Sequence, residues 1–199
     1  MTLNRGTRIQ DNMRKATRLA CVLLAAVAAG AQPPRAVDTA HSRMTVRVFR
    51  GGLFAFAGHN HEIRAPITSG TVDEATGSVE LHVDARQLEV LDPEVDEKER
   101  KEVQETMHGA KVLDSARYSE IRFRSAEARK SGEEWVVRGE LTLHGQTRPV
   151  EVRVRGGNGR YTGSATVKQK EFGMEPVSVA GGTVKVKDEV KVEFEIALQ

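Results

Sequence analysis

The sequence Val184-Lys-Val-Lys-Asp-Glu-Val-Lys-Val-Glu-Phe-Glu-Ile-Ala-Leu198 alternates between two kinds of side chain almost without interruption. The even-numbered positions are apolar except Asp188, and the odd-numbered positions are Lys or Glu except Ala197. Successive side chains of a β-strand point to opposite faces, so this period of two predicts a strand with one buried and one solvent-facing side.

The same alternation recurs along the chain between segments rich in Gly, Asn, Asp and Pro, which are typical of turns. Strands buried on both faces would lose the alternation, so the pattern favours an antiparallel sheet. Closing the sheet into a barrel would remove its exposed edges. We therefore predict an all-β fold, an antiparallel barrel of about eight strands. The supporting runs are residues 44–48, 79–84, 121–124, 135–143, 150–155 and 184–198.

Residues 96–108 break the alternation and predict one charged α-helix, because they are rich in helix-forming residues and contain no Gly or Pro. Asp96 is suited to cap its N-terminus, and Glu99 occupies the position of a capping-box partner. Its apolar residues Val103 and Met107 are four positions apart and form one narrow stripe. The helix is therefore either a lid over one end of the barrel or a solvated connector.

Residues 1–31 have the pattern of a secretory signal peptide. Basic residues precede an apolar run of about 13 residues, which ends at Ala29-Gly-Ala31. This run is shorter than the roughly 20 residues that span a bilayer, so we expect no stable membrane insertion. We expect a periplasmic or secreted protein whose mature domain comprises residues 32–199. Its single cysteine, Cys21, lies in the leader, which leaves the mature chain without a disulfide or a cysteine nucleophile.

The charge of the mature domain argues against nucleic acid as a partner. The whole chain has a formal charge of +2, but its first 31 residues contain five basic side chains and one acidic one. The remainder has 25 Lys and Arg against 27 Asp and Glu, a net charge of −2. Binding to phosphates requires a basic surface, which this balance does not supply. A homodimer is compatible with the sequence.

Five aromatic residues are our candidates for the lumen or rim of the barrel, because they offer a large apolar contact area: Phe54, Phe56, Phe123, Trp135 and Phe172. The alternative is that each simply belongs to the core. The interior as a whole leaves a similar choice open, because small barrels are filled by their own side chains in some proteins and hold a ligand in others.

A second candidate site is His59 and His61, which point the same way on an extended strand and have Glu62 beside them. A zinc site needs at least a third ligand, and the remaining histidines have no motif spacing. The alternative is a polar turn or barrel rim, so we assign no metal and no cofactor. The sequence also lacks the nucleophile, phosphate-loop and metalloprotease motifs of common enzymes, and we expect no catalytic activity. The other histidines are His41, His82, His108 and His144.

The order of several short motifs resembles the YceI-like family of periplasmic polyisoprenoid-binding proteins, and the resemblance covers nearly all of residues 32–199. Ser119 follows Tyr118 where the family usually has proline. The motifs are Asp38-x-x-His41-Ser42, Tyr118-x-x-Ile121-x-Phe123-x-Ser125, Gly139-x-Leu-Thr-Leu-His144-Gly145-x-Thr-Arg-Pro-Val150 and Phe172-Gly173. We interpret the third motif as two strands around a glycine turn.

The resemblance implies a lipocalin-like barrel that holds an apolar lipid, such as a polyisoprenoid, in its lumen. Each buried methylene contributes roughly 0.8 kcal/mol, so a long apolar chain can be bound without a specific polar contact. Two alternatives remain from the sequence: a metal-binding or metal-dependent site at His59 and His61, and a filled barrel that acts as an interaction or stress-response module.

Overall fold

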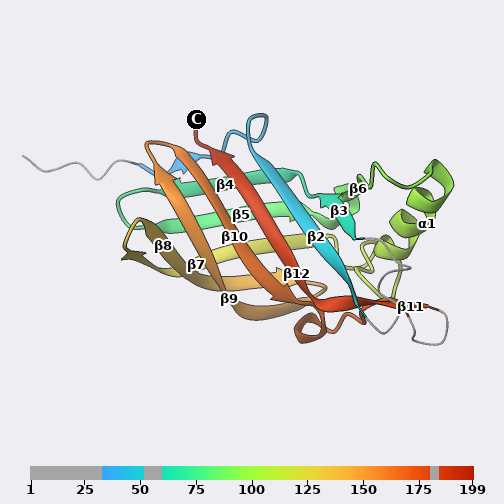
Figure 1. Ribbon diagram of the computed structural model, residues 1–199. Helices are drawn as coiled ribbons and strands as arrows, with labels where there is room; N and C mark the ends of the chain where they lie inside the picture. Colours follow the sequence, from blue (N-terminus) through green and yellow to red (C-terminus); the bar gives the residue numbers. More distant parts are fainter. Residues whose placement is uncertain (1–32, 52–59, 180–183) are drawn as a thin grey trace, which may run out of the picture. The chain divides into compact units, whose positions relative to one another are not determined.

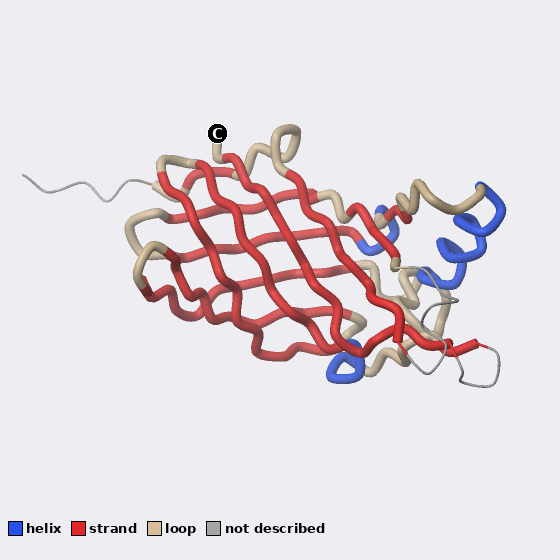
Figure 2. Tube along the Cα trace, viewed as in Figure 1, coloured by secondary structure: helices blue, strands red, loops and turns tan. Residues whose placement is uncertain are grey.

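The computed structural model describes residues 33–51, 60–179 and 184–199, and most of these residues belong to one antiparallel sheet (Figures 1 and 2). The all-β prediction is confirmed, but the expected number of about eight strands is too low. Eleven strands follow one another across the sheet, and a twelfth, β11, pairs with β12. The strands are β1 Arg35–Ala36, β2 Arg43–Gly51, β3 His61–Arg64, β4 Ile67–Asp73, β5 Ser78–Asp84, β6 Glu89–Val90, β7 Glu120–Ser131, β8 Glu134–Leu143, β9 Gln146–Gly157, β10 Arg160–Lys168, β11 Ser178–Val179 and β12 Val184–Ala197.

The strand predicted from residues 184–198 is β12, which lies between β10 and β2 in the sheet. Its register with β10 runs from Arg160 opposite Ala197 to Lys168 opposite Glu189. Four consecutive even-numbered residues of the strand, Val190, Val192, Phe194 and Ile196, line the interior of the barrel. The period of two therefore predicted both the strand and the face that is turned inward.

The short strand β1 closes the barrel by pairing with β4 on one side and meeting the end of β12 on the other. Arg35 lies opposite Val72 in β4, and a bridge joins Val37 to Leu198. The Asp38 N–H donates to the Ala197 carbonyl at 2.8 Å, and the Gln199 N–H donates to the Ala36 carbonyl at 2.9 Å. These bonds pair backbone groups that an open sheet would leave exposed at its edges.

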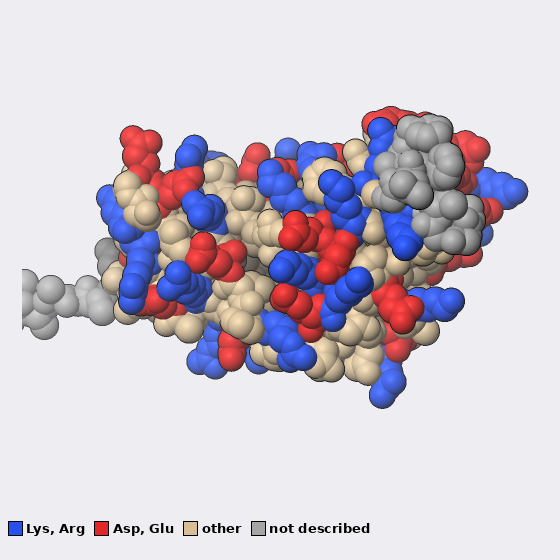
Figure 3. Space-filling view, turned by 60° about the horizontal axis from the view of Figure 1, so that its bottom comes forward, with Lys and Arg blue, Asp and Glu red and all other residues tan. Residues whose placement is uncertain are grey.

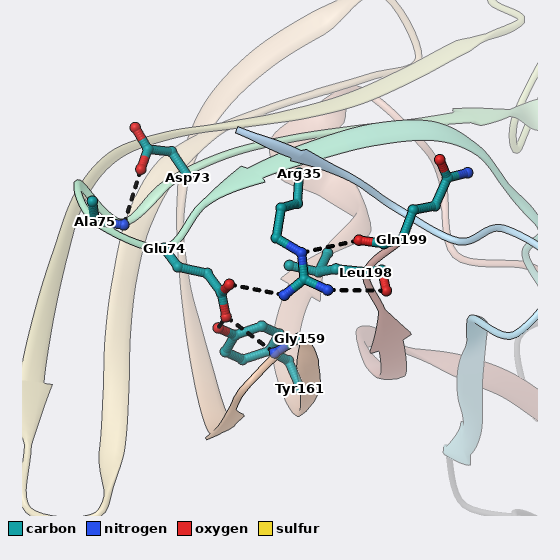
Figure 4. A network of polar contacts seen from close by, with 8 residues as sticks. All are labelled: Arg35, Asp73, Glu74, Ala75, Gly159, Tyr161, Leu198 and Gln199. Atoms are coloured by element: carbon teal, nitrogen blue, oxygen red, sulfur yellow. Dashed lines mark hydrogen bonds and ion pairs between the residues drawn. The ribbon is translucent and has the colours of Figure 1, made fainter. Parts of the chain in front are cut away.

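A network of polar contacts lies at the end of the barrel where β1 closes the sheet (Figure 4). We call this the closed end of the barrel. Arg35 donates to the Leu198 and Gln199 carbonyl oxygens at 3.4 and 3.0 Å, and to the Glu74 carboxylate at 3.0 Å. Glu74 also accepts hydrogen bonds from the Tyr161 hydroxyl and from the Gly159 N–H. The network thus joins β1, the β4–β5 turn, the β9–β10 turn and the C-terminus.

The single α-helix of the described residues, α1 (Glu97–His108), lies beside β3 and β6 at the other end of the barrel (Figure 1). The predicted cap is confirmed, because the Asp96 carboxylate accepts from the Glu99 N–H at 2.8 Å. Met107 is buried and Val103 packs against the core, as the narrow apolar stripe predicted. The side chain of Gln104 holds the helix to β6, accepting from the Val90 N–H and donating to the Leu88 carbonyl, both at 2.7 Å.

Two short 3-10 helices complete the described structure, η2 (Ala85–Gln87) and η3 (Gln169–Phe172). Phe172 ends η3 with 0% of its surface exposed and is the largest fully buried side chain. The β8–β9 hairpin fixes it from outside, because the ring nitrogen Nδ1 of His144 donates to the Phe172 carbonyl at 2.9 Å. His144 and Gly145 form the hairpin turn with φ angles of 50° and 70°, as the glycine turn predicted.

Replacing Phe172 with alanine should lower the free energy of unfolding by about 3–5 kcal/mol, because it leaves a cavity in a fully enclosed part of the core. Urea denaturation followed by circular dichroism measures the change. Phe49→Ala is the matched control, because Phe49 follows the inward-facing Val48 and lies on the outer face of β2. An equal loss in both variants would contradict the placement of Phe172.

Replacing Glu74 with glutamine should destabilise the barrel by about 1–2 kcal/mol at pH 7, because the carboxylate loses charged hydrogen bonds at the closed end. The Tyr161 hydroxyl and Arg35 lower the pKa of Glu74 from its ordinary value of 4.5. The carboxylate therefore contributes its full stabilisation above about pH 4.5 and loses it as the pH falls through the lower folded-state pKa.

Chemical denaturation of the parent and of Glu74→Gln from pH 7 to pH 3 should show a difference in unfolding free energy that shrinks in acid. The exposed Glu133, in the β7–β8 turn, provides the control Glu133→Gln, which should leave stability nearly unchanged throughout. A difference between parent and Glu74→Gln that stays constant over this range would exclude ionised Glu74 as the cause.

Candidate ligand-binding cavity

The barrel encloses a cavity of about 630 Å³, within the range of pockets that hold small molecules. Valine, leucine, isoleucine, methionine and aromatic side chains from opposite parts of the sheet line most of it. Several of these residues, among them Met44, Ile121 and Val192, are only partly buried even though they face inward. They are not covered by other side chains because they border the open lumen, so the barrel is not filled by its own core.

The structure brings two of the five predicted aromatic residues to the cavity. Phe123 on β7 and Trp135 on β8 both line it. Phe172 does not, because η3 turns its side chain into the solid core rather than toward the lumen. Phe54 and Phe56 lie outside the described residues.

The ring of Phe123, on β7, lies directly over Gly139 of the neighbouring strand β8. A Cβ atom at Gly139 would lie 2.7 Å from two ring carbons of Phe123 and 2.4 Å from the Arg124 carbonyl oxygen. Only glycine therefore leaves room at this inner position of β8 for the ring to lie across the strand. Phe194 covers Gly163 in the same way, with 2.4 Å between the ring and a Cβ built at that glycine.

The list of aromatic candidates omitted Phe194 and Tyr161, although both line the cavity. The alternation of residues 184–198 places Phe194 on the apolar face and was enough to find it. Met107 is a third lining residue that was not a ligand candidate, although its place on the apolar stripe of the helix was recognised. Tyr161 had a weaker signal, because Gly163 and Ala165 leave its face of the strand with little apolar side chain.

The cavity is polar and acidic at the end of the barrel where β1 closes the sheet. Asp73 at the end of β4, Glu74 and Thr76 in the β4–β5 turn, and Asn158 in the β9–β10 turn line it there. Tyr161 lies beside them, and burial together with the hydrogen bond to Glu74 raises the pKa of its hydroxyl to about 12. Among the described lining residues there is no Lys, Arg or His.

The opposite end of the cavity is apolar and is formed partly by the helix. Leu88 follows η2, Met107 lies in the last turn of α1, and Val112 and Leu113 follow the helix. All four are buried. The C-terminal turn of α1 is thus part of the cavity wall, which agrees with a lid rather than with a solvated connector.

Within the described residues, His61 is bound to a buried carboxylate rather than placed among metal ligands. Its Nδ1 lies 2.6 Å from Asp92 Oδ2, and the side chain of Asp92 is 2% exposed. His59 lies outside the described residues. No three residues able to ligate a metal are grouped in the described part of the chain, so the geometry there gives the metal hypothesis no third ligand.

The remaining histidines have separate structural contacts. His41 pairs with Asp38 at 2.7 Å, which explains the Asp38-x-x-His41 spacing. This contact, with further hydrogen bonds from the backbone, lowers the pKa of Asp38. His82 contacts Glu80 on the outer face, His108 contacts Ser115, and His144 holds η3.

The outer surface contrasts with the lumen. Lys and Arg side chains alternate with Asp and Glu over the face shown in Figure 3, with no broad area of one sign. Typical pairs are Arg47 with Glu193 and Arg155 with Glu134, both at 2.7 Å. Mixed charge of this kind offers no basic stripe on this face for a nucleic-acid backbone. Within the described residues, no helix has the length and apolar character needed to cross a bilayer.

Comparison with known proteins relates the barrel to other sequences and structures. The model of the YceI-like domain matches residues 36–198. A UPF0312 protein of Vibrio cholerae serotype O1 is 28% identical over 170 residues, which cover 79% of this chain and 84% of the relative. The crystal structure of BcnA from Burkholderia cenocepacia shares the fold, with a TM-score of 0.58 at 20% identity over 80% of this chain and 98% of BcnA.

A lower structural similarity, with a TM-score of 0.48 at 13% identity, is found to a Campylobacter jejuni YceI protein, covering 69% of this chain and 81% of that protein. The family match extends from β1 to the residue after β12, so it includes every strand that encloses the cavity. The YceI-like barrel is a binding-protein fold and not that of a known enzyme family. The chain belongs to the YceI-like domain family.

Proposed function

We propose that this protein binds a long apolar lipid, of the polyisoprenoid kind, inside its barrel and shields it from water. The observation that supports the proposal most directly is the cavity of about 630 Å³ with a predominantly apolar lining. A barrel of this size is often filled by its own side chains, so an open apolar lumen indicates a ligand rather than a core.

The energetics of burial favour such a ligand. Each methylene moved from water into the lumen contributes roughly 0.8 kcal/mol, whereas association costs about 4–15 kcal/mol. A few isoprene units therefore offset the cost of association without a specific polar contact. Side chains that already face an open lumen, such as Ile121 and Val192, would gain the contacts they lack in the unfilled barrel.

The charges around the lumen favour an uncharged lipid. The described lining includes the carboxylates of Asp73 and Glu74 but no Lys, Arg or His. A phosphate or carboxylate head group inside the cavity would lose its hydration and find no cation to replace it. The proposed ligand is therefore an isoprenoid with a neutral polar end.

The comparisons support the general part of this proposal. The YceI-like match supports a barrel-fold binding protein, and the likeness to BcnA supports the fold alone. Neither identifies the ligand. The described residues provide no favourable observation for a metal-dependent function, and the open lumen argues against a filled interaction module.

Protein isolated from its host's envelope should carry an extractable apolar lipid, visible by native mass spectrometry. The same lumen should bind an added polyprenol and raise the melting temperature, because a ligand that binds only the folded state stabilises it. Absence of both the bound lipid and the thermal shift would contradict the proposal.

Filling the lumen should weaken polyprenol binding. Val150 is a partly buried lining residue of β9, and its neighbour Glu151 is on the outer face, paired with Arg138. Val150→Trp should lower affinity by roughly tenfold or more, since displacing two buried methylenes costs about 1.6 kcal/mol. Glu151→Trp places the same side chain outside and should bind like the parent in a fluorescence titration. Equal affinity of both variants would place the lipid elsewhere.

We further infer from the basic and apolar pattern of residues 1–31 that the protein is exported and acts in the periplasm or outside the cell. Mass spectrometry of the protein recovered from the envelope fraction should then find a mature N-terminus close to Gln32. Recovery of the intact leader in the cytoplasmic fraction would contradict export.

A further inference from the structure

A polar pair lies on the inner face of the sheet at the helical end of the barrel. In β3, Ile63 is buried and lines the cavity, and His61 is two residues away on the same face. Its partner across the β2–β3 register is Val48, which also lines the cavity. His61 is therefore a polar residue at the edge of the cavity: it is not itself one of the lining residues, but it lies on the same face of the sheet as two of them.

The carboxylate of Asp92 fixes the orientation of the His61 ring. Ile63 lies opposite Val90 in β6, and the Leu91 N–H extends the pairing by donating to the Glu62 carbonyl at 2.8 Å. Asp92 consequently lies opposite His61, where its Oδ1 accepts from the Glu62 N–H at 2.7 Å and its Oδ2 lies 2.6 Å from His61 Nδ1. Asp92 is 2% exposed, so the carboxylate cannot turn away to solvent without leaving its partners.

This arrangement determines which ring nitrogen is available to a ligand. A carboxylate accepts hydrogen bonds and does not donate them, so Nδ1 of His61 carries the proton that the 2.6 Å contact requires. In the neutral ring, Nε2 then has a free lone pair. No residue of the described chain hydrogen-bonds to Nε2, and the His61 side chain is 20% exposed.

The acceptors at the other end of the lumen already have partners within the protein. Glu74 accepts hydrogen bonds from Tyr161, Gly159 and Arg35. Asp73 Oδ1 accepts from the Ala75 and Thr76 N–H groups at 2.9 and 3.2 Å. His61 Nε2, by contrast, has no hydrogen-bond partner in the described structure.

We propose that His61 anchors the polar end of the bound lipid, with Nε2 accepting a hydrogen bond from a terminal hydroxyl group. This inference rests on the proposed function and specifies it: the ligand is an isoprenoid alcohol whose hydroxyl lies at the helical end. Asp92 is a positioning residue that holds the ring in the accepting tautomer. The ligand's apolar chain then lies along the lumen toward the β4–β5 and β9–β10 turns.

Binding of farnesol and of farnesyl methyl ether tests the inference, because the ether has the same chain but no hydroxyl proton. Fluorescence titration of the parent should show farnesol binding roughly five- to tenfold more tightly than the ether, the effect of one hydrogen bond. His61→Leu should bind the two probes about equally. Its affinity for the ether should stay close to that of the parent, which a general loss of structure would not produce.

Three further variants separate anchoring from folding. His61→Gln keeps an amide donor for Asp92 and replaces the second ring nitrogen with a carbonyl acceptor, so it should retain part of the preference for farnesol. Asp92→Asn should reduce the preference while leaving ether binding unchanged. His82→Leu is the control and should retain the parent's preference, because His82 contacts Glu80 on the outer face.

The outcomes separate this inference from the proposed function. Equal binding of both probes by the parent, or an undiminished preference in His61→Leu, would overturn the role of His61 while leaving lipid binding intact. Failure of the parent to bind either probe would overturn the lipid-binding proposal and, with it, the assignment of His61.

Discussion

The inner face of the barrel is apolar along nearly every strand, yet its side chains do not fill the space that they enclose. Both properties follow from one constraint, the closure of a long antiparallel sheet on itself. Alternation sends every second side chain inward, and closure by β1 between β4 and β12 sets how many strands share the interior. The apolar lining excludes water only if the sheet closes, and the closing strand is two residues long. The Arg35–Glu74 network therefore supports the lumen even though its polar groups lie at one end of it.

The two ends of the barrel differ in ways that bear on ligand binding. At one end, tight turns bring carboxylates and a tyrosine together, and their hydrogen bonds are made within the protein. At the other, α1 contributes Met107 to the lining, while Gln104 holds the helix to β6 through paired backbone contacts. An apolar chain in the lumen would contact acidic side chains at the first end and larger apolar side chains at the second.

The features that could be read from the sequence are those with a local cause. The period of two placed β12 and its inward face, Asp96 marked the start of α1, and the glycine turn marked the β8–β9 hairpin. The short strands β1 and β6 were missed because two residues show no period, and their pairing depends on distant partners.

The candidate site was predicted less completely than the fold. Phe172 was a candidate for the lumen or rim, because hydrophobicity alone does not distinguish a lining residue from an enclosed one. The 3-10 turn of η3 determines that its side chain is enclosed. The bond between His61 and Asp92 joins residues 31 positions apart, which spacing did not suggest.

The bonds from Arg35 to the carbonyl oxygens of Leu198 and Gln199 span almost all of residues 33–199, with sequence separations of 163 and 164 residues. The strand that completes the sheet begins with the same arginine. Closure of the barrel therefore depends on contacts of high sequence separation, and such contacts form slowly. Residues 198 and 199 must be present before these contacts can form, so the barrel completes its folding only after almost all of this segment has been synthesised.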